Sequence, residues 1–448
     1  MMRLTVPFLA AVFASSLAGQ QNRPIGGNLR PAALRQNDAG RVDANFLIPA
    51  MTLYLNSSAE QRANLQQLLR YQQNPRSPLF HQWLTPEQFA DRFGLSSADS
   101  QAIADWLTSQ GFTVKKIARS RTWIAFSGTA GQAERAFHTE IHRYVFQGKS
   151  YFANATEPSM PAALAGMVSG VGGMDDYTLE STQPQFTSSF GHTLAPDDIA
   201  TIYDISALYQ AGIDGSGQKI AVMGTTVFDA AALADVAAFR SRYNLPANVP
   251  QMVTDSDAAP LGVTGETGEA HLDVEWAGAV ARNAQIIFVA ATTFLGAVRY
   301  TVDNNLAPVI TMSANNGCEA QNNPAQMNFY QALAQQANAQ GITWVNSGSD
   351  AGAASCDANG SGIAENGLGL RFPASIPEVT AVGGTEFDEQ NGSYWNNANS
   401  ASGASVAVLY SRDGVERFWR AQCVVGGRRR NQRLLPETGM AGGAGRSK

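Results

Sequence analysis

The period of the hydrophobic positions changes along the chain and separates two folded regions, 41–177 and 197–404. In the first region, apolar residues at helical spacing alternate with strand-like runs. Thr85 and Gln88 form a predicted capping box around Pro86, and Gly111 is a predicted helix end. The elements predict a ferredoxin-like α+β fold with helices on one face of an antiparallel sheet. The predicted helices are 58–72, 84–94, 98–111 and 129–141, and the predicted strands are 45–56, 112–117 and 122–128, with a hairpin over 143–154.

The second region alternates continuous apolar runs with amphipathic helices. Strands that are apolar on both faces and joined by helical crossovers predict a parallel sheet with helices on both faces, the α/β class. Such sheets place their sites at the carboxyl ends of the strands. The predicted strands are 219–224, 284–291, 308–314, 341–347 and 379–384, and the predicted helices are 229–243, 269–281 and 328–340.

Three further segments have no such period. Residues 1–18 carry Arg3, a short apolar run and a small-residue cleavage signal, which predicts a secretory signal peptide and a secreted protein. Residues 178–196 are rich in Ser, Thr, Gln and Pro and are predicted to be a linker. Residues 405–448 hold eight arginines and form an aberrant Arg/Gly-rich tail. A reading-frame shift near Ser405 and a genuinely diverged tail both explain that change.

The composition limits the classes of partner that the protein is expected to bind. Of the 448 residues, 44% are hydrophobic and 15% are charged, and the formal net charge is -6. An acidic chain lacks the basic face that nucleic acids require, so no nucleic-acid partner is expected. No segment after the signal peptide is predicted to span a membrane.

An acid pair lies in the predicted helix 269–281. Glu269 and Asp273 are four residues apart, so they share one helix face. An acidic first turn that complements the helix dipole is the simpler explanation of the pair, and Glu266 supports it. Other polar groups follow strands of the same sheet, which favours a site instead. These are the stretch from Ser313 to Glu319 and Asp350 in a glycine-rich turn.

Two cysteines follow neighbouring strands. Cys318 and Cys356 would tie two loops at the predicted site if they formed a disulfide, which export permits. Two free thiols are the alternative.

Together these stretches resemble the sedolisin (serine-carboxyl) peptidases of the kumamolisin-like branch. The resemblance rests on GETGEAHLDVEW, VITMSANNGCE and WVNSGSDAGAASCD, and in the first region on NPRSPLFHQWLTPEQFADRFG, AFHTEIHRY and YFANATEPSMPAALAGMVSGV. It implies a subtilisin-like catalytic domain over 197–404. It also implies a pro-kumamolisin-type activation prodomain over 41–177 that packs against this domain. Protein or peptide substrates follow from it.

The resemblance also implies roles for the acids. Glu269 matches the general base, Asp273 the residue that orients it, and Asp350 the oxyanion-hole acid, although the turn around Asp350 departs from the family order. A carboxylate base works in acid, where a histidine would be protonated. A carboxylic acid donates to an oxyanion only when neutral. His271 points away from the acid pair and is expected to be a supporting or surface residue.

The family's nucleophile segment, Gly-Thr-Ser-x-x-x-Pro, is not found in these 448 residues. The calcium expected in intact family members has no recognisable ligand segment either, so no metal ligands are assigned. The sequence therefore predicts a secreted, acid-acting endopeptidase precursor, C-terminally truncated, whose copy here is catalytically incomplete. The alternative is a non-catalytic binding or inhibitory protein that uses the prodomain.

Overall fold

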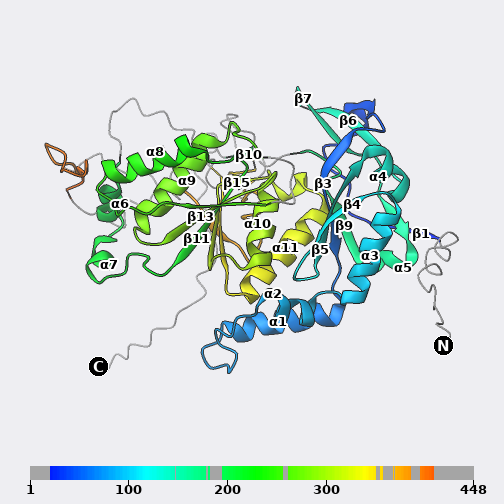
Figure 1. The fold of residues 1–448 in the computed structure, drawn as a ribbon, viewed down its shortest axis with the longest axis horizontal. Coiled ribbons are helices and arrows are strands. Elements are labelled where there is room, and N and C mark those ends of the chain that lie inside the picture. The colour runs from blue at the N-terminus through cyan, green and yellow to red at the C-terminus, as the bar shows by residue number, and fades with distance from the viewer. Residues whose placement is uncertain are drawn as a thin grey trace, which may run out of the picture.

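The structure is a computed structural model, and it describes residues 21–146, 148–177, 180–181, 194–255, 261–349, 354–356, 367, 369–384 and 394–407. Two large sheets organise these residues. A four-stranded antiparallel sheet, in the order β4-β5-β3-β9, belongs to the first region. A six-stranded parallel sheet, in the order β12-β13-β11-β14-β16-β17, belongs to the second. They form two halves that lie side by side, with helices α10 and α11 between them (Figure 1).

The elements of the first region surround its antiparallel sheet. The strands are β1 (Asn22–Pro24), β2 (Asp38–Arg41), β3 (Leu47–Leu55), β4 (Thr113–Ile117), β5 (Trp123–Thr129), β6 (Ile141–Phe146), β7 (Lys149–Asn154), β8 (Ser159–Pro161) and β9 (Val168–Gly172). The helices are η1 (Arg35–Asn37), α1 (Ala59–Gln72), α2 (Pro86–Phe93), α3 (Ser97–Ser109), α4 (Ala130–Phe137) and α5 (Ala162–Ala165). β10 (Glu180–Ser181) follows in the predicted linker.

The second region alternates strands and helices. The strands are β11 (Lys219–Gly224), β12 (Gln251–Thr254), β13 (Gln285–Ala290), β14 (Val309–Met312), β15 (Ala314–Asn315), β16 (Thr343–Ser347) and β17 (Thr380–Val382). The helices are α6 (Pro196–Ile202), α7 (Ser206–Gln210), α8 (Ala230–Arg242), α9 (Thr267–Val280), α10 (Phe294–Asn304), η2 (Glu319–Gln321) and α11 (Pro324–Ala339).

The antiparallel sheet buries both of its faces. Because side chains alternate along a strand, neighbouring residues enter different cores. Leu53 and Phe126 pack with α3 and α4, whereas Tyr54 and Trp123 pack on α10 and α11 of the second region. The ring of Tyr54 stacks on Phe329 of α11, with centroids 4.0 Å apart. One face of the sheet therefore carries its own helices, and the other binds the second region.

The parallel sheet is also covered on both faces. Met223 and Ile310 face α10 and α11, and Val222 and Phe288 face α8 and α9. The predicted α/β architecture, a parallel sheet with helices on both faces, is confirmed. The α+β character of the first region is visible as well, while its ferredoxin-like arrangement stays a prediction.

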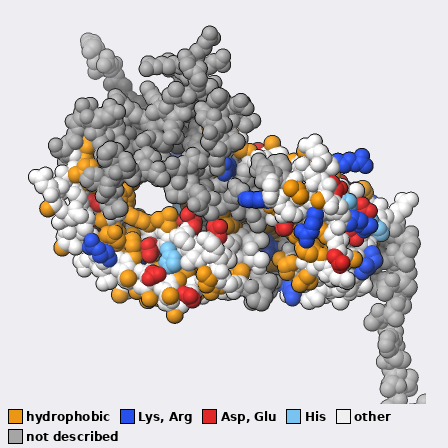
Figure 2. Space-filling model, turned by 90° about the horizontal axis from the view of Figure 1, so that it is seen from above, with side chains coloured by type: hydrophobic (Ala, Val, Ile, Leu, Met, Phe, Trp, Pro, Cys, Tyr) orange, Lys and Arg blue, Asp and Glu red, His pale blue; other side chains and the backbone are white. Residues whose placement is uncertain are grey.

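A buried charge joins the two regions. Asp303 at the end of α10 has a fully buried side chain, and its oxygens accept from the backbone N–H groups of Arg119 and Ser120 at 3.2 and 3.1 Å. The ammonium of Lys116 lies 3.3 Å from the same carboxylate. The donors all belong to the first region and the acceptor belongs to the second. On the face that Figure 2 shows, Lys and Arg side chains gather mostly over the first region.

Local signals in the sequence set several element ends. The capping box of Thr85 and Gln88 and Pro86 in the first turn are present in α2. Gly111 follows α3 with φ of +88°, a backbone conformation that glycine adopts without cost. The predicted hairpin is present as β6 and β7.

Other expectations need correction. The helix predicted over 129–141 is α4, which ends at Phe137, because His138 adopts a left-handed conformation and Ile141 begins β6. Helix α10 and strand β12 were not predicted from the sequence. The first carries Gly296 and several β-branched residues, and the second has four residues, so neither shows a clear period.

Candidate active site

Helix α9 carries the acid pair at the sheet's face. Thr267 begins the helix, so Glu269 lies in its first turn and Asp273 one turn further on, on the same side. Val274 and Ala270 of this helix are buried against Phe288 and Phe228. These apolar contacts fix the rotation of α9 about its axis, and with it the direction of the acid face.

Asp273 is held by a residue from the middle of the sheet. The hydroxyl of Ser313, directly after β14, donates to Oδ1 of Asp273 at 2.7 Å. Burial raises the pKa of Asp273 from 3.8 to about 6, and the Ser313 hydrogen bond opposes part of that rise. A carboxyl with this pKa stays protonated in mildly acidic solution, so it can donate a hydrogen bond there.

His271 lies between the two acids in sequence but not in space. Its Nδ1 is 2.8 Å from the carbonyl oxygen of Thr267, and its ring packs on Phe228 with centroids 4.8 Å apart. The histidine therefore points away from the acid pair, as predicted from the sequence, and packs on Phe228.

A short strand directly follows Ser313 in the chain. β15, Ala314–Asn315, pairs antiparallel with β10, in the register Glu180↔Asn315 and Ser181↔Ala314. Residues of the predicted linker thus lie as an added strand beside the segment that binds Asp273 (Figure 1). This strand could not be predicted from the sequence, because two residues in a polar segment give no periodic signal.

The backbone around β15 is held from the other side too. The side-chain amide of Asn346 in β16 donates to the carbonyl oxygen of Ala314 at 3.1 Å, and Arg371 donates to Oδ1 of Asn315 at 3.2 Å. Cys318 and Cys356 form a disulfide with Cα atoms 5.5 Å apart. The loops after β15 and β16 are therefore joined covalently, as the sequence suggested.

Several predicted features lie outside the described residues. Asp350, the predicted oxyanion acid, is one of them, and so are the signal peptide 1–18 and the part of the tail beyond residue 407. Their roles stay predictions. Of the predicted site, the described structure places Glu269 and Asp273 on one helix and brings Ser313 to Asp273.

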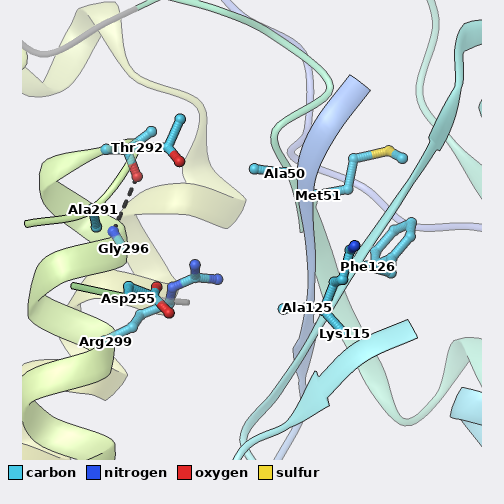
Figure 3. A pocket seen from close by; sticks show the side chains of 11 residues that line it. Ala50, Met51, Lys115, Ala125, Phe126, Asp255, Ala291, Thr292, Gly296 and Arg299 are labelled. Carbon is cyan, nitrogen blue, oxygen red and sulfur yellow. Dashed lines mark hydrogen bonds between the residues drawn. The ribbon is translucent and has the colours of Figure 1, made fainter. Parts of the chain in front are cut away.

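A cavity of about 20 Å³, room for about one water molecule, lies between the two regions. Thr292 and Arg299 line it from the second region, and Met51 and Phe126 line it from the first (Figure 3). Neither Glu269 nor Asp273 lines it. This space belongs to the contact between the regions and is too small for a peptide.

The described residues offer no gathering of three His, Cys, Asp or Glu side chains that could hold a metal ion, so we assign no calcium site to them. Within the same residues, no helix has the length and apolarity needed to cross a membrane.

Comparison with known proteins shows which family the chain resembles. The sequence model described as "Pro-kumamolisin, activation domain" matches residues 35–177. Xanthomonalisin of Xanthomonas sp. (strain T-22) is 27% identical over 400 residues, which cover 79% of this chain and 48% of that protein. Sedolisin of Pseudomonas sp. (strain 101) is 27% identical, covering 89% of this chain and 72% of that protein. Kumamolisin of Bacillus sp. (strain MN-32) is 28% identical, covering 73% and 62%.

The chain is similar to the sedolisin family of peptidases over most of its length, and its first region matches the pro-kumamolisin activation domain. It spans about half the length of xanthomonalisin and 62% of kumamolisin. The activity and substrates of the whole protein therefore remain to be proposed from the site.

Proposed function

We propose that the chain is the precursor form of a secreted, acid-acting serine-carboxyl endopeptidase, which hydrolyses peptide bonds in proteins. The observation that carries the proposal is the acid pair of α9, with Asp273 partly buried and bound to Ser313 at a carboxyl end of the parallel sheet. Glu269 is the proposed general base and Asp273 the acid that orients it. Asp350 is the proposed oxyanion donor.

The chemistry of the pair fits acid conditions. Two carboxyls one turn apart interact favourably only when one is protonated and the other is charged. The raised pKa of Asp273 keeps this carboxyl protonated below about pH 6, so it can donate a hydrogen bond to Glu269, the proposed base.

We further propose that this particular chain does not turn over substrate. These 448 residues contain no Gly-Thr-Ser-x-x-x-Pro segment to supply the nucleophile that a serine peptidase needs within reach of its base. We also propose that residues 1–18 direct export of the chain, and that intact relatives bind calcium.

The second candidate is a non-catalytic binding or inhibitory protein. The favouring observation is that the activation domain stays docked on α10 and α11 through a shared core, while β10 pairs beside Ser313. An added strand at this position would compete with an extended peptide for the same backbone groups.

The test is incubation of the purified chain with casein near pH 4, alone and together with an intact relative such as sedolisin. We expect no cleavage by the chain alone. Cleavage that Glu269→Gln abolishes would contradict the proposed inactivity and reveal another nucleophile. Loss of the relative's activity in the mixture would favour the inhibitory function, and full activity would exclude it.

A further inference from the structure

The carboxyl group of Asp273 has two oxygens, and the structure distinguishes between them. Oδ1 accepts a hydrogen bond of 2.7 Å from the Ser313 hydroxyl. An ionised carboxylate only accepts hydrogen bonds, so the hydroxyl is the donor in that state. An oxygen that already accepts a well-placed proton is the poorer site for a second one, which directs the carboxyl's own proton to Oδ2.

Ser313 is well fixed for this task. It directly follows β14, an interior strand of the parallel sheet that is paired with β11 and β16. The next two residues form β15, whose backbone is held by β10 and by the amide of Asn346. The hydroxyl is therefore presented by a stretch of backbone that has partners before and after it.

The groups around Asp273 define what else can influence it. Burial and the Ser313 hydroxyl are the two causes of its displaced pKa among the described residues. On its own helix, Glu269 lies one turn earlier on the same side, and His271 is turned toward Phe228. Ser313 is thus the polar group that the sheet contributes to Asp273.

We propose that Ser313 is a positioning residue of the acid pair, whose hydroxyl engages Oδ1 of Asp273 and leaves Oδ2 to exchange a proton with Glu269. This inference rests on the proposed function of the pair. The sequence placed Ser313 near the site without assigning it a role, and the inference gives it a defined action, through Asp273 and not on the substrate.

The test measures the titration of Asp273 in the full chain labelled with [4-¹³C]aspartate, its resonance being assigned by its loss in Asp273→Asn. Removing a hydrogen bond to the charged form, as in Ser313→Ala, should raise the apparent pKa of Asp273 by roughly one. Ser313→Thr keeps a hydroxyl and should restore the original value. Ser347→Ala, the same change at the end of neighbouring β16, should leave the titration unchanged.

A second arm separates this inference from the function of the pair. Glu269→Gln removes the neighbouring acid and should lower the apparent pKa of Asp273, because a like charge no longer opposes its ionisation. If the apparent pKa of Asp273 changes in Glu269→Gln but not in a folded Ser313→Ala variant, the proposed role of Ser313 is wrong. A change in the apparent pKa of Asp273 in Ser313→Ala, with none in Glu269→Gln, would support the Ser313–Asp273 contact. It would contradict the coupling of Glu269 to Asp273.

Discussion

At the residue scale, the chain uses burial to alter the chemistry of a common acid. Asp273 is ordinary in sequence, yet its partial burial between α9 and the sheet raises its pKa to about 6, while the hydroxyl of Ser313 limits the rise. Asp105 on α3 has the same side chain, but it is exposed to solvent. Environment, and not residue type, therefore decides which acids can hold a proton in mildly acidic solution.

The raised pKa of Asp273 makes stability depend on pH. The folded chain binds this proton more tightly than the unfolded chain, so the contribution is complete below about pH 3.8 and is lost as the pH rises through about 6. Asp273→Asn resembles the neutral acid and should raise the free energy of unfolding at pH 7 by about 1–3 kcal/mol. At pH 3 the change should be close to zero.

Urea denaturation of both proteins at the two pH values measures this difference. Asp105→Asn is the matched control, since it makes the same chemical change at an exposed site. Equal stabilities of Asp273→Asn and the parent chain at pH 7 would show that Asp273 is not destabilised by burial.

At the scale of elements, the turn between β4 and β5 recognises the end of α10. The turn presents two consecutive backbone N–H groups, and β4 adds the Lys116 ammonium, to one carboxylate, Asp303, whose side chain is fully buried. The same ammonium lies 5.6 Å from the Trp123 ring and 5.3 Å from the Tyr300 ring. A buried acid is tolerated here because hydrogen-bond donors and a counter-charge are all within reach of its carboxylate.

We expect Asp303→Asn to weaken this contact strongly. The amide loses the ion pair and leaves Lys116 without its counter-charge in a partly buried place, which should cost about 3–5 kcal/mol of unfolding free energy. Amide hydrogen exchange would show the loss as faster exchange of Arg119 and Ser120. Slow exchange at these two amides in the variant would contradict the proposed anchoring.

At the scale of the whole molecule, one core is shared by two regions of different architecture. Tyr54, Trp123 and Ala125 of the antiparallel sheet belong to the same buried cluster as Phe329 and Leu333 of α11. A contact built from buried apolar side chains persists without a covalent link. The activation domain is thus bound as an integral layer of the fold.

Cutting the chain within residues 182–193, after insertion of a protease recognition sequence, should therefore leave the two fragments associated at neutral pH. Size-exclusion chromatography measures this as co-elution. Ala125→Glu places a charge in the shared core and should separate the fragments, whereas Gln101→Glu on the exposed face of α3 should not. Separation of the fragments with the native residues in place would refute the shared core as the binding surface.

The sequence by itself determined the elements with strong local signals. The capping box at Thr85, the glycine at 111 and the apolar runs of β11, β13, β14 and β16 depend on neighbours within a few residues, so they could be predicted. The family and its activation domain were recognised from short motifs for the same reason. α10 was not predicted, since contacts on all sides stabilise it and its own pattern does not.

The tertiary structure alone decided what meets across the sheet. Ser313 and Asp273 are 40 residues apart, and the partners of Asp303 are more than 180 residues away in the chain. Helix spacing placed Glu269 and Asp273 on one face, but the donor from β14 and the burial that sets the pKa arise only when α9 packs on the sheet. Local sequence sets helix faces and turns, whereas the electrostatics of a site depend on groups that folding brings together from distant positions.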